Sequence, residues 1–278
     1  MRLGTSGLWA EVRADRWVPG SFELVVDGTP QSHVHLDRPE ELFFEYVQRI
    51  GAVIDLIGDP GEPLTALHLG AGALTLPRYV EATRPGSTQH VIELERELVE
   101  LVRRELPLPP RARIRVRYGD ARETLDRLPT GLRGSVDVVV VDVFAGARTP
   151  AHVTTVEFYR LLRPLLSERG VVAVNVADGH GLAFARGQAA TVGEAVGDVI
   201  ALAEVQLLKG RRFGNVVLAA SPAPIDARWL PRLLAAGPHP AKVLEGDELR
   251  RWIGGAPAST DATATPSPEP NRSVFGPR

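Results

Sequence analysis

The feature that most constrains the fold of this chain is an apolar run at residues 136–144, which reads VDVVVVDVF. A strand with one face in water alternates apolar and polar side chains, whereas this run is apolar on consecutive positions from Val138 to Val141. Such a strand is buried on both faces, and helices provide that cover in parallel sheets. The run therefore predicts an α/β domain with helices on both sides of a sheet.

Shorter apolar runs before and after it provide the other strands of the predicted sheet. They lie at residues 66–69, 90–92, 114–116, 171–176 and 216–220. Segments with helical spacing separate them, at residues 95–105, 121–128, 155–166 and 191–203. This alternation predicts a doubly wound α/β sheet, in which ligands bind in the crevice outside the carboxyl ends of the strands.

The two ends of the chain depart from this pattern. Residues 21–35 alternate apolar and polar side chains around an Asp-Gly pair, which predicts a small N-terminal β hairpin, and apolar spacing then predicts a helix over 40–57 with Pro39 in its first turn. Residues 254–278 are rich in Pro, Ser, Thr and Ala without periodicity, so we expect a disordered tail. The expected domains are the β element with its linking helix at 1–60, the α/β domain at 61–253, and the tail.

Composition excludes several classes of function. The 278 residues include 32 Lys and Arg against 34 Asp and Glu, so the net charge of −2 gives no electrostatic reason to bind nucleic acid or an anionic membrane. The chain has no cysteine, which excludes disulfides, thiolate metal sites and a cysteine nucleophile. No apolar run reaches the length of about 20 residues that spans a bilayer. We therefore expect a soluble, cytoplasmic protein.

The stretch LHLGAGALTLPRYV, residues 67–80, carries the most informative motif. A strand runs directly into the turn of Gly70 and Gly72, where small side chains let a ligand approach the backbone before a helix begins, although a Gly-x-Gly alone could equally be a tight turn. Glu93 closes the next strand about twenty residues later, where a carboxylate can accept hydrogen bonds from both ribose hydroxyls. Glu95 is the rival acid, but a place in the first turn of a helix, beside its dipole, explains Glu95 better.

Two further acids stand at strand ends. Asp120 follows the strand at 114–116, where it could accept a hydrogen bond from the adenine amine, cap the helix that starts near Ala121, or do both. Asp142 ends the strongest strand, and a carboxylate displayed there lies in the crevice outside the strand ends. We expect Asp142 to carry the chemistry. With Glu93 and the glycine turn, these acids describe a nucleoside pocket.

This set of strand ends resembles class I S-adenosylmethionine-type, Rossmann-like folds. Over about residues 20–220 the chain resembles the spermidine synthase, or polyamine aminopropyltransferase, family. The segments that carry the resemblance are LVVDGTPQS in the hairpin, Phe43-Phe44-Glu45, the glycine turn through Arg78, Glu93-Leu94-Glu95, Gly119-Asp120-Ala121, and Val141-Asp142 followed by TVEFY. The resemblance implies a homodimeric transferase of polyamine biosynthesis, which moves the aminopropyl group of decarboxylated S-adenosylmethionine to a polyamine or another amine without a metal.

The resemblance also assigns roles to single residues. Gln31 and Glu93 become contacts to the thioadenosine sugar region, and Asp120 becomes a contact to adenine. Asp142 becomes the acid that orients the attacking amine and helps to deprotonate it.

The chain departs from the family pattern at the groups that recognise cations. Ala73 stands where the family has an Asp that helps to hold the aminopropyl ammonium, and Ala145 stands at the second acid of the Asp-x-x-Asp motif. In the triplet that touches the diamine, only Glu45 keeps its acid. Each carboxylate lost from such a site removes on the order of 1.5–3 kcal/mol of binding. Glu45, or Asp178 at the end of the next strand, could hold the substrate ammonium instead. Alternatively, Asp178 could only stabilise the turn with Gly179.

Two other functions remain open from the residues. One is methyl transfer from S-adenosylmethionine to a small molecule in the same pocket. The absence of the family's Asp at position 73 favours this function. The other is nucleoside binding by a protein that has lost turnover. His33, His35 and His68 show no metal-ligand spacing, and the chain contains no Gly-x-Ser-x-Gly elbow. We therefore expect neither a metal site nor hydrolase chemistry.

Overall fold

The computed structural model describes residues 1–235 and 241–269. Its N-terminal part is an antiparallel sheet in the order β1-β2-β3, formed by β1 (Ala10–Ala14), β2 (Ser21–Val26) and β3 (Thr29–His35). Asp27 and Gly28 join β2 to β3 with φ of 49° and 77°, and two left-handed residues are what a tight hairpin turn needs. The predicted hairpin is confirmed, and β1 adds a strand to it.

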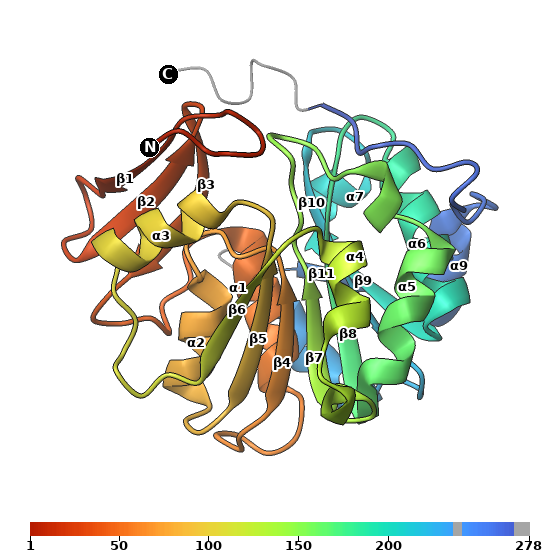
Figure 1. The fold of residues 1–278 in the computed structure, drawn as a ribbon. Helices are drawn as coiled ribbons and strands as arrows, with labels where there is room; N and C mark the ends of the chain where they lie inside the picture. The colour runs from red at the N-terminus through yellow and green to blue at the C-terminus, as the bar shows by residue number, and fades with distance from the viewer. Residues whose placement is uncertain (236–240, 270–278) are drawn as a thin grey trace.

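The second sheet is the main sheet of the molecule (Figure 1). Within the described residues it has eight strands, in the order β11-β9-β10-β8-β7-β4-β5-β6. They are β4 (Thr65–Leu69), β5 (Thr88–Glu93), β6 (Ile114–Tyr118), β7 (Val136–Val141), β8 (Leu166–Asp178), β9 (Asp198–Glu204), β10 (Gly214–Ser221) and β11 (Ala241–Leu244). Strands β4 to β8 are parallel, whereas β10 pairs antiparallel with β8 and β9, and β11 with β9. The doubly wound sheet is confirmed, with antiparallel strands at one side.

Helices cover both faces of the main sheet. They are α1 (Glu45–Asp55), α2 (Thr75–Thr83), α3 (Arg96–Glu105), α4 (Ala121–Thr124), α5 (Val156–Leu162), α6 (Ala183–Ala195), α7 (Val205–Leu208), α8 (Leu230–Leu234) and α9 (Gly246–Ile253). Helices α1, α2 and α8 share an apolar cluster on one face, while α5, α6 and α9 share another on the opposite face. Among the described residues, no helix combines the length and the apolar character needed to traverse a bilayer.

Strand β7 shows why helices are needed on both sides. Val138 and Val140 pack in the cluster that includes α1, whereas Val139 and Val141 pack in the cluster that includes α5. None of the four is more than 2% exposed. Full burial of one such side chain contributes about 1.5–3 kcal/mol, so leaving the two valines of either face of β7 in water would cost about twice that amount. The sequence pattern of this strand thus determines the layered architecture.

Two helices of the sequence analysis need correction. The spacing predicts a helix over 191–203, but α6 ends at Ala195, the chain turns at Gly197 with φ of 146°, and β9 follows. The apolar run 199–203 is buried against both faces of the sheet. A short run of this kind suits an internal strand as well as a buried helix, so periodicity alone does not separate the two.

Helix α1 is shorter than the predicted helix at 40–57. It begins at Glu45 after an extended Phe44, so Pro39 lies before the helix and not in its first turn. Its apolar face packs on the main sheet. Residues 1–60 are therefore divided in space, with the hairpin on one side and α1 within the α/β layers.

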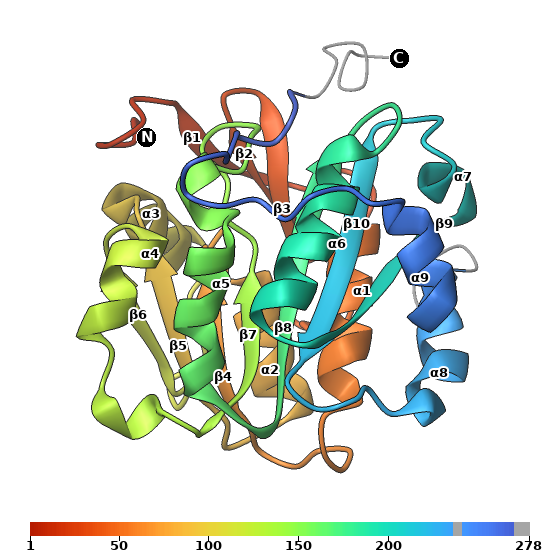
Figure 2. The same ribbon diagram turned by 90° about the vertical axis from the view of Figure 1, so that its right-hand side faces the viewer.

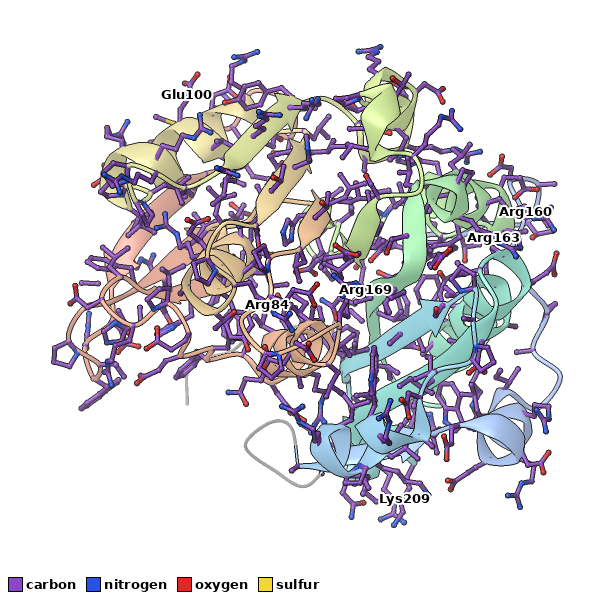
Figure 3. The ribbon with its side chains drawn as sticks, turned by 90° about the horizontal axis from the view of Figure 1, so that it is seen from below. Arg84, Glu100, Arg160, Arg163, Arg169 and Lys209 are labelled. Atoms are coloured by element: carbon purple, nitrogen blue, oxygen red, sulfur yellow. The ribbon has the colours of Figure 1, made fainter. Side chains whose placement is uncertain are left out.

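Arg84 and Arg169 lie at the amino-terminal edge of the main sheet, which Figure 3 shows from below. Arg84 is 2% exposed and donates to the backbone carbonyl oxygens of Ile54 and Glu62. Arg169 donates to the carboxylates of Glu62 and Asp137. Both arginines are therefore engaged with neighbouring groups at this edge of the sheet.

The C-terminal segment, residues 254–269, corrects the expectation of a disordered tail. Figure 2 shows it (blue) crossing α6 and α5. The carbonyl oxygen of Ser259 accepts a hydrogen bond from the N–H of Val156 at 2.8 Å, and the N–H of Ser259 donates to Thr191 Oγ1 at 2.8 Å. The segment contains no helix or strand, as its composition predicts, but its polar groups bond to the α/β domain.

The far end of the C-terminal segment bonds to the loop between β7 and α5. Ser267 is 0% exposed, and Thr149 exchanges two hydrogen bonds with it, at 2.8 and 3.0 Å. Arg148 also donates to the carbonyl oxygen of Ser267 at 2.6 Å. The remainder of the predicted tail, residues 270–278, lies outside the described residues.

Removal of the C-terminal segment tests this packing. We expect a chain that ends after Ile253 to melt about 5 °C below one that ends after Glu269, because the longer chain keeps buried hydrogen bonds that together contribute about 1–3 kcal/mol. Differential scanning calorimetry measures the difference. Equal melting temperatures would show that the contacts of Ser259 and Ser267 do not stabilise the fold.

Candidate active site

A cavity of about 710 Å³ opens at the carboxyl edge of the main sheet. Its wall is formed by the ends of β4 to β8, by β2 and β3, by the start of α1 and by the loop after β7. The predicted site residues that line it are Gln31, Glu45, Gly70, Gly72, Glu93, Asp120 and Asp142. The structure thus brings residues from separate strand ends to one crevice, as the rule for open α/β sheets predicts.

The glycine turn after β4 leaves no room for side chains. Gly70 has φ of 92°, and a Cβ there would lie 2.2 Å from the carbonyl oxygen of Asp142. Gly72 has φ of 48°, and its Cβ would lie 2.4 Å from Ser32 Oγ. That hydroxyl accepts a hydrogen bond from the N–H of Ala73 at 3.1 Å. The turn is therefore held between the end of β7 and strand β3, which gives both glycines a structural reason beside any contact to ligand.

Glu93 holds the glycine turn from the neighbouring strand. Its carboxylate accepts hydrogen bonds from the N–H groups of Ala71 at 2.8 Å and Glu95 at 2.9 Å. Burial raises the pKa of Glu93, and the hydrogen bonds from the backbone oppose this rise without cancelling it. Each carboxylate oxygen has a further lone pair, so Glu93 can still accept hydrogen bonds from ribose hydroxyls. The ribose contact stays a prediction.

Glu95 has partners that the sequence pattern did not indicate. Its carboxylate accepts the N–H groups of Thr5 at 2.9 Å and Ser6 at 2.6 Å. Burial acts to raise the pKa of Glu95, but the hydrogen bonds from Ser6 and Thr5 outweigh it and lower the pKa. These bonds hold the N-terminal segment against the cavity, and Leu3, Thr5, Ser6 and Leu8 line it.

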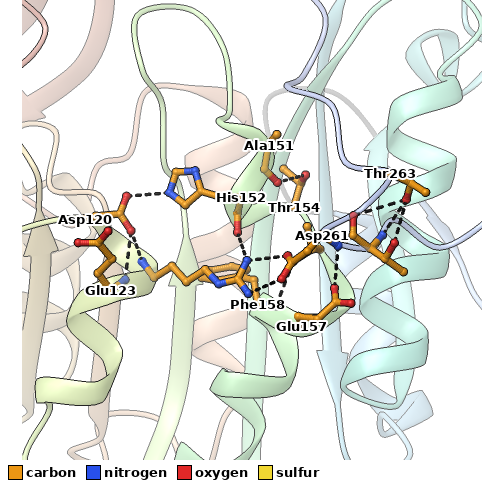
Figure 4. A network of polar contacts seen from close by, with 12 residues as sticks. Asp120, Glu123, Ala151, His152, Thr154, Glu157, Phe158, Asp261 and Thr263 are labelled. Carbon is orange, nitrogen blue, oxygen red and sulfur yellow. Dashed lines mark hydrogen bonds and ion pairs between the residues drawn. The ribbon is translucent and has the colours of Figure 1, made fainter.

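Asp120 both caps a helix and faces the cavity. Its Oδ1 accepts the N–H groups of Arg122 at 2.8 Å and Glu123 at 3.1 Å, and its Oδ2 lies 2.7 Å from His152 Nε2 (Figure 4). Burial acts to raise the pKa of Asp120, but the hydrogen bonds from Glu123 and His152 outweigh it and lower the pKa. The capping role that the sequence left open is present. A contact to adenine would share Oδ2 with His152, a cavity residue that the sequence analysis missed.

The C-terminal segment reaches this part of the wall. Arg122 makes two hydrogen bonds of 2.7 Å to the carboxylate of Asp261 and donates to the carbonyl oxygen of His152 at 3.0 Å (Figure 4). The hydrogen bond from Arg122 lowers the pKa of Asp261 to about 2. Through Arg122, residues 254–269 therefore fix the position of His152 beside Asp120.

Asp142 lies in a cluster of polar side chains from three elements. Asn175 of β8 donates from Nδ2 to Asp142 Oδ1 at 2.8 Å, and the hydroxyl of Tyr46 at the start of α1 donates to the same carboxyl group. Burial raises the pKa of Asp142 to about 6, although both hydrogen bonds lower it. A carboxyl group with this pKa, held by two donors, is suited to accept a proton near neutral pH.

Asn175 and Tyr46 are functional candidates that the sequence analysis missed. A single amide within the apolar run 171–176 was the available signal, because a polar side chain in a buried strand needs a hydrogen-bond partner. Asn175 is 4% exposed, and within the described residues its Oδ1 has no partner. Tyr46 gave no signal beyond its place next to Glu45.

Two predicted residues are engaged within the fold. Asp178 is 3% exposed, does not line the cavity, and accepts the N–H groups of Gly179 at 2.6 Å and Ala185 at 2.8 Å. Asp178 thus stabilises the turn that follows its strand, and it is not part of the proposed site. Glu45 lines the cavity and forms an ion pair with Arg49.

The described residues contain no group of three or more His, Asp and Glu side chains placed to hold a metal ion. His33 lies 2.9 Å from Asp15, and His68 lies 3.1 Å from Gln89. His33 and His68 are thus hydrogen-bonded within the fold.

Comparison with known proteins relates most of the chain to one group of enzymes. No protein-family model matches the chain. A solved structure, that of a probable spermidine synthase from Corynebacterium glutamicum, is 33% identical and has a TM-score of 0.81, covering 91% of this chain and 93% of that one. A spermidine synthase in complex with the transition state analogue AdoDATO has a TM-score of 0.61, covering 89% of this chain and 85% of that one, and at 13% identity it shows the fold alone.

Curated relatives cover a shorter part. The polyamine aminopropyltransferase of Vibrio vulnificus is 29% identical over 139 residues, which are 50% of this chain and 45% of that protein. The chain thus spans about half the length of the curated relatives that it matches.

The raised pKa of Asp142 predicts a pH-dependent effect on stability. An unperturbed Asp ionises near 3.8, whereas Asp142 in the folded chain ionises near 6. Between these pH values the folded chain keeps a proton that the unfolded chain has lost, so the free energy of unfolding falls as the pH rises, by up to about 3 kcal/mol. We expect Asp142→Asn to remove this loss. Its melting temperature relative to wild type should be more favourable at pH 7 than at pH 4.

Calorimetry at the two pH values measures this difference. Asp120→Asn is the control, because the pKa of Asp120 is lowered and its ionised form stabilises the fold above pH 3.8. Its relative melting temperature should therefore change little between pH 4 and pH 7, since both lie above 3.8. The same relative melting temperature for Asp142→Asn at both pH values would contradict a raised pKa.

Proposed function

The chain belongs to the spermidine synthase family, and we propose that it transfers the aminopropyl group of decarboxylated S-adenosylmethionine to an amine. The relationship that covers 91% of this chain and 93% of the relative carries the proposal. The cavity supports it, because its lining includes Asp142 together with the strand-end acids Glu93 and Asp120 and the start of α1.

We assign the nucleoside to the part of the cavity formed by β4, β5 and β6. The glycine turn offers backbone that a ligand can approach closely, and Glu93 has lone pairs for the ribose hydroxyls. Asp120 is assigned to adenine, and Gln31 of β3 to the sugar region from the opposite wall. This arrangement follows from the order of strand ends along the sheet.

We assign the reacting centre to Asp142. The nitrogen of a neutral amine attacks the aminopropyl carbon beside the sulfonium; a C–N bond forms, the C–S bond breaks, and its electron pair stays on the sulfur of departing methylthioadenosine. The proton that the nitrogen loses passes to the Asp142 carboxylate and then to water. An amine with a pKa near 10.4 is neutral in about one of 10³ molecules at pH 7, so a positioned proton acceptor lowers the barrier.

Product analysis tests the proposal and its rivals. Methylthioadenosine formed from decarboxylated S-adenosylmethionine and an amine would support aminopropyl transfer. S-adenosylhomocysteine formed from S-adenosylmethionine would support a small-molecule methyltransferase. Nucleoside-dependent melting shifts without either product would support a nucleoside-binding protein without turnover. The homodimer that the family implies and the cytoplasmic location expected from the composition remain predictions.

Glu93→Ala tests the ribose assignment. We expect the Kd for methylthioadenosine to rise by about 100-fold, because two charge-assisted hydrogen bonds contribute about 3 kcal/mol. Isothermal titration calorimetry measures the affinity. Glu100→Ala is the matched control, because it removes the same charge from the neighbouring helix at an exposed residue that does not line the cavity. An unchanged Kd in Glu93→Ala would remove Glu93 from the nucleoside site.

Asp142→Asn tests the proton acceptor. We expect kcat to fall by about 10²–10⁴-fold while the Kd for methylthioadenosine changes little, because the amide keeps the shape of the carboxyl group but cannot take a proton. In wild type, kcat/KM should fall as the pH drops through about 6, where Asp142 becomes protonated. Full turnover by the variant would exclude Asp142 from the mechanism.

A further inference from the structure

Asp142 divides the cavity into two halves. Strand β7 lies between β4 and β8 in the main sheet, so the ends of β4, β5 and β6 lie on one side of Asp142 and the ends of β8 and β10 on the other. The second side, here named the acceptor half, is lined by Val47, Asn175, Leu207, Arg212, Phe213 and Asn215. Because the nucleoside is assigned to the first side, the attacking amine approaches from the acceptor half.

Charge is distributed unequally between the two halves. The nucleoside side carries Glu93, Glu95 and Asp120. In the acceptor half, among the described lining residues, Arg212 is paired with Glu204, and Glu45 at the start of α1 is paired with a buried arginine, so neither offers an unpaired charge to a ligand. Asp142 itself is bonded to neutral donors, and it is the group that receives the proton of the attacking nitrogen.

A diamine fits this arrangement poorly. One of its nitrogens must be neutral to attack, but the other stays protonated and has to enter the acceptor half. There it would leave water without gaining an unpaired carboxylate, because Glu45 is paired with Arg49 and the nearby Arg212–Glu204 pair carries no net charge. Loss of hydration without a partner is the condition under which a buried charge is unfavourable.

An uncharged chain fits the same walls well. Val47 from α1, Leu207 from α7 and Phe213 before β10 give the acceptor half an apolar lining. Methylene groups that leave water against these side chains gain free energy in proportion to the area buried. Asn175 and Asn215 place amide groups, not carboxylates, at the remaining polar positions.

We infer that the acceptor is an amine whose far end carries no positive charge, and not a diamine. The inference rests on the proposed aminopropyl transfer, which supplies the donor and the place of the reacting carbon. It concerns the acceptor half, whose charge distribution is independent of which nucleoside occupies the other side.

The first test compares two acceptors of equal chain length. With decarboxylated S-adenosylmethionine as donor, we expect kcat/KM for n-butylamine to exceed that for putrescine by at least tenfold. Methylthioadenosine release measures both rates. An equal or higher kcat/KM for putrescine would overturn the inference.

The second test changes the charge of the acceptor half. Arg212→Gln removes a cation and leaves the carboxylate of Glu204 without its ion-pair partner. Arg211→Gln is the matched control, because it removes the same charge at the adjacent residue, which does not line the cavity. We expect the ratio of putrescine to n-butylamine turnover to rise severalfold in Arg212→Gln at low salt and to stay unchanged in Arg211→Gln. Equal ratios in the two variants would show that charge in the acceptor half does not select the substrate.

A binding measurement separates this inference from the proposed function. In protein saturated with methylthioadenosine, n-butylamine should raise the melting temperature more than putrescine at equal concentration. If no amine accepts an aminopropyl group, the proposed function fails, while the order of these two melting shifts still decides the inference. A larger shift with putrescine would overturn it.

Discussion

The site depends on one close approach of two backbone segments. The carbonyl oxygen of Asp142 lies so near Gly70 that any Cβ there would be 2.2 Å away. This contact places the end of β7 against the glycine turn, and the carboxylate of Glu93 holds the same turn through the N–H of Ala71. Ser32 anchors it from the N-terminal sheet. Three separate parts of the chain thus meet at backbone atoms, and the acids take their positions from that meeting.

Much of this arrangement could be predicted from the sequence, because the relevant signals are local. Val138 to Val141 require cover on both faces, and the Gly-x-Gly turn and the strand-end acids follow their strands directly. Carboxyl ends of parallel strands lie at one edge, so chain order alone predicts that Glu93, Asp120 and Asp142 share a crevice. Asp178 also follows a strand of this sheet, but its carboxylate accepts hydrogen bonds from the N–H groups of Gly179 and Ala185 and does not line the cavity.

What could not be predicted depends on partners that are distant in the chain. The acid of Glu95 bonds to Thr5 and Ser6, about ninety positions away, and Asp120 to His152. No local pattern indicates such pairs, since each needs the tertiary fold to exist first. The helix predicted over 191–203 was wrong at β9 for another reason. The short apolar run of β9 fits a buried strand as well as a buried helix. The pKa of Asp142 likewise depends on burial that the sequence does not display.

The C-terminal segment also bears on how the protein is made. Arg122 bonds to Asp261 and Arg148 to Ser267, across 139 and 119 positions of the chain. During synthesis, strands β4 to β7, the glycine turn and Asp142 leave the ribosome well before the C-terminal segment that bonds to the cavity wall. The loop between β7 and α5 gains these bonds only when residue 267 has emerged. The nascent chain therefore carries Asp142 in an incomplete cavity until residues 254–269 have emerged.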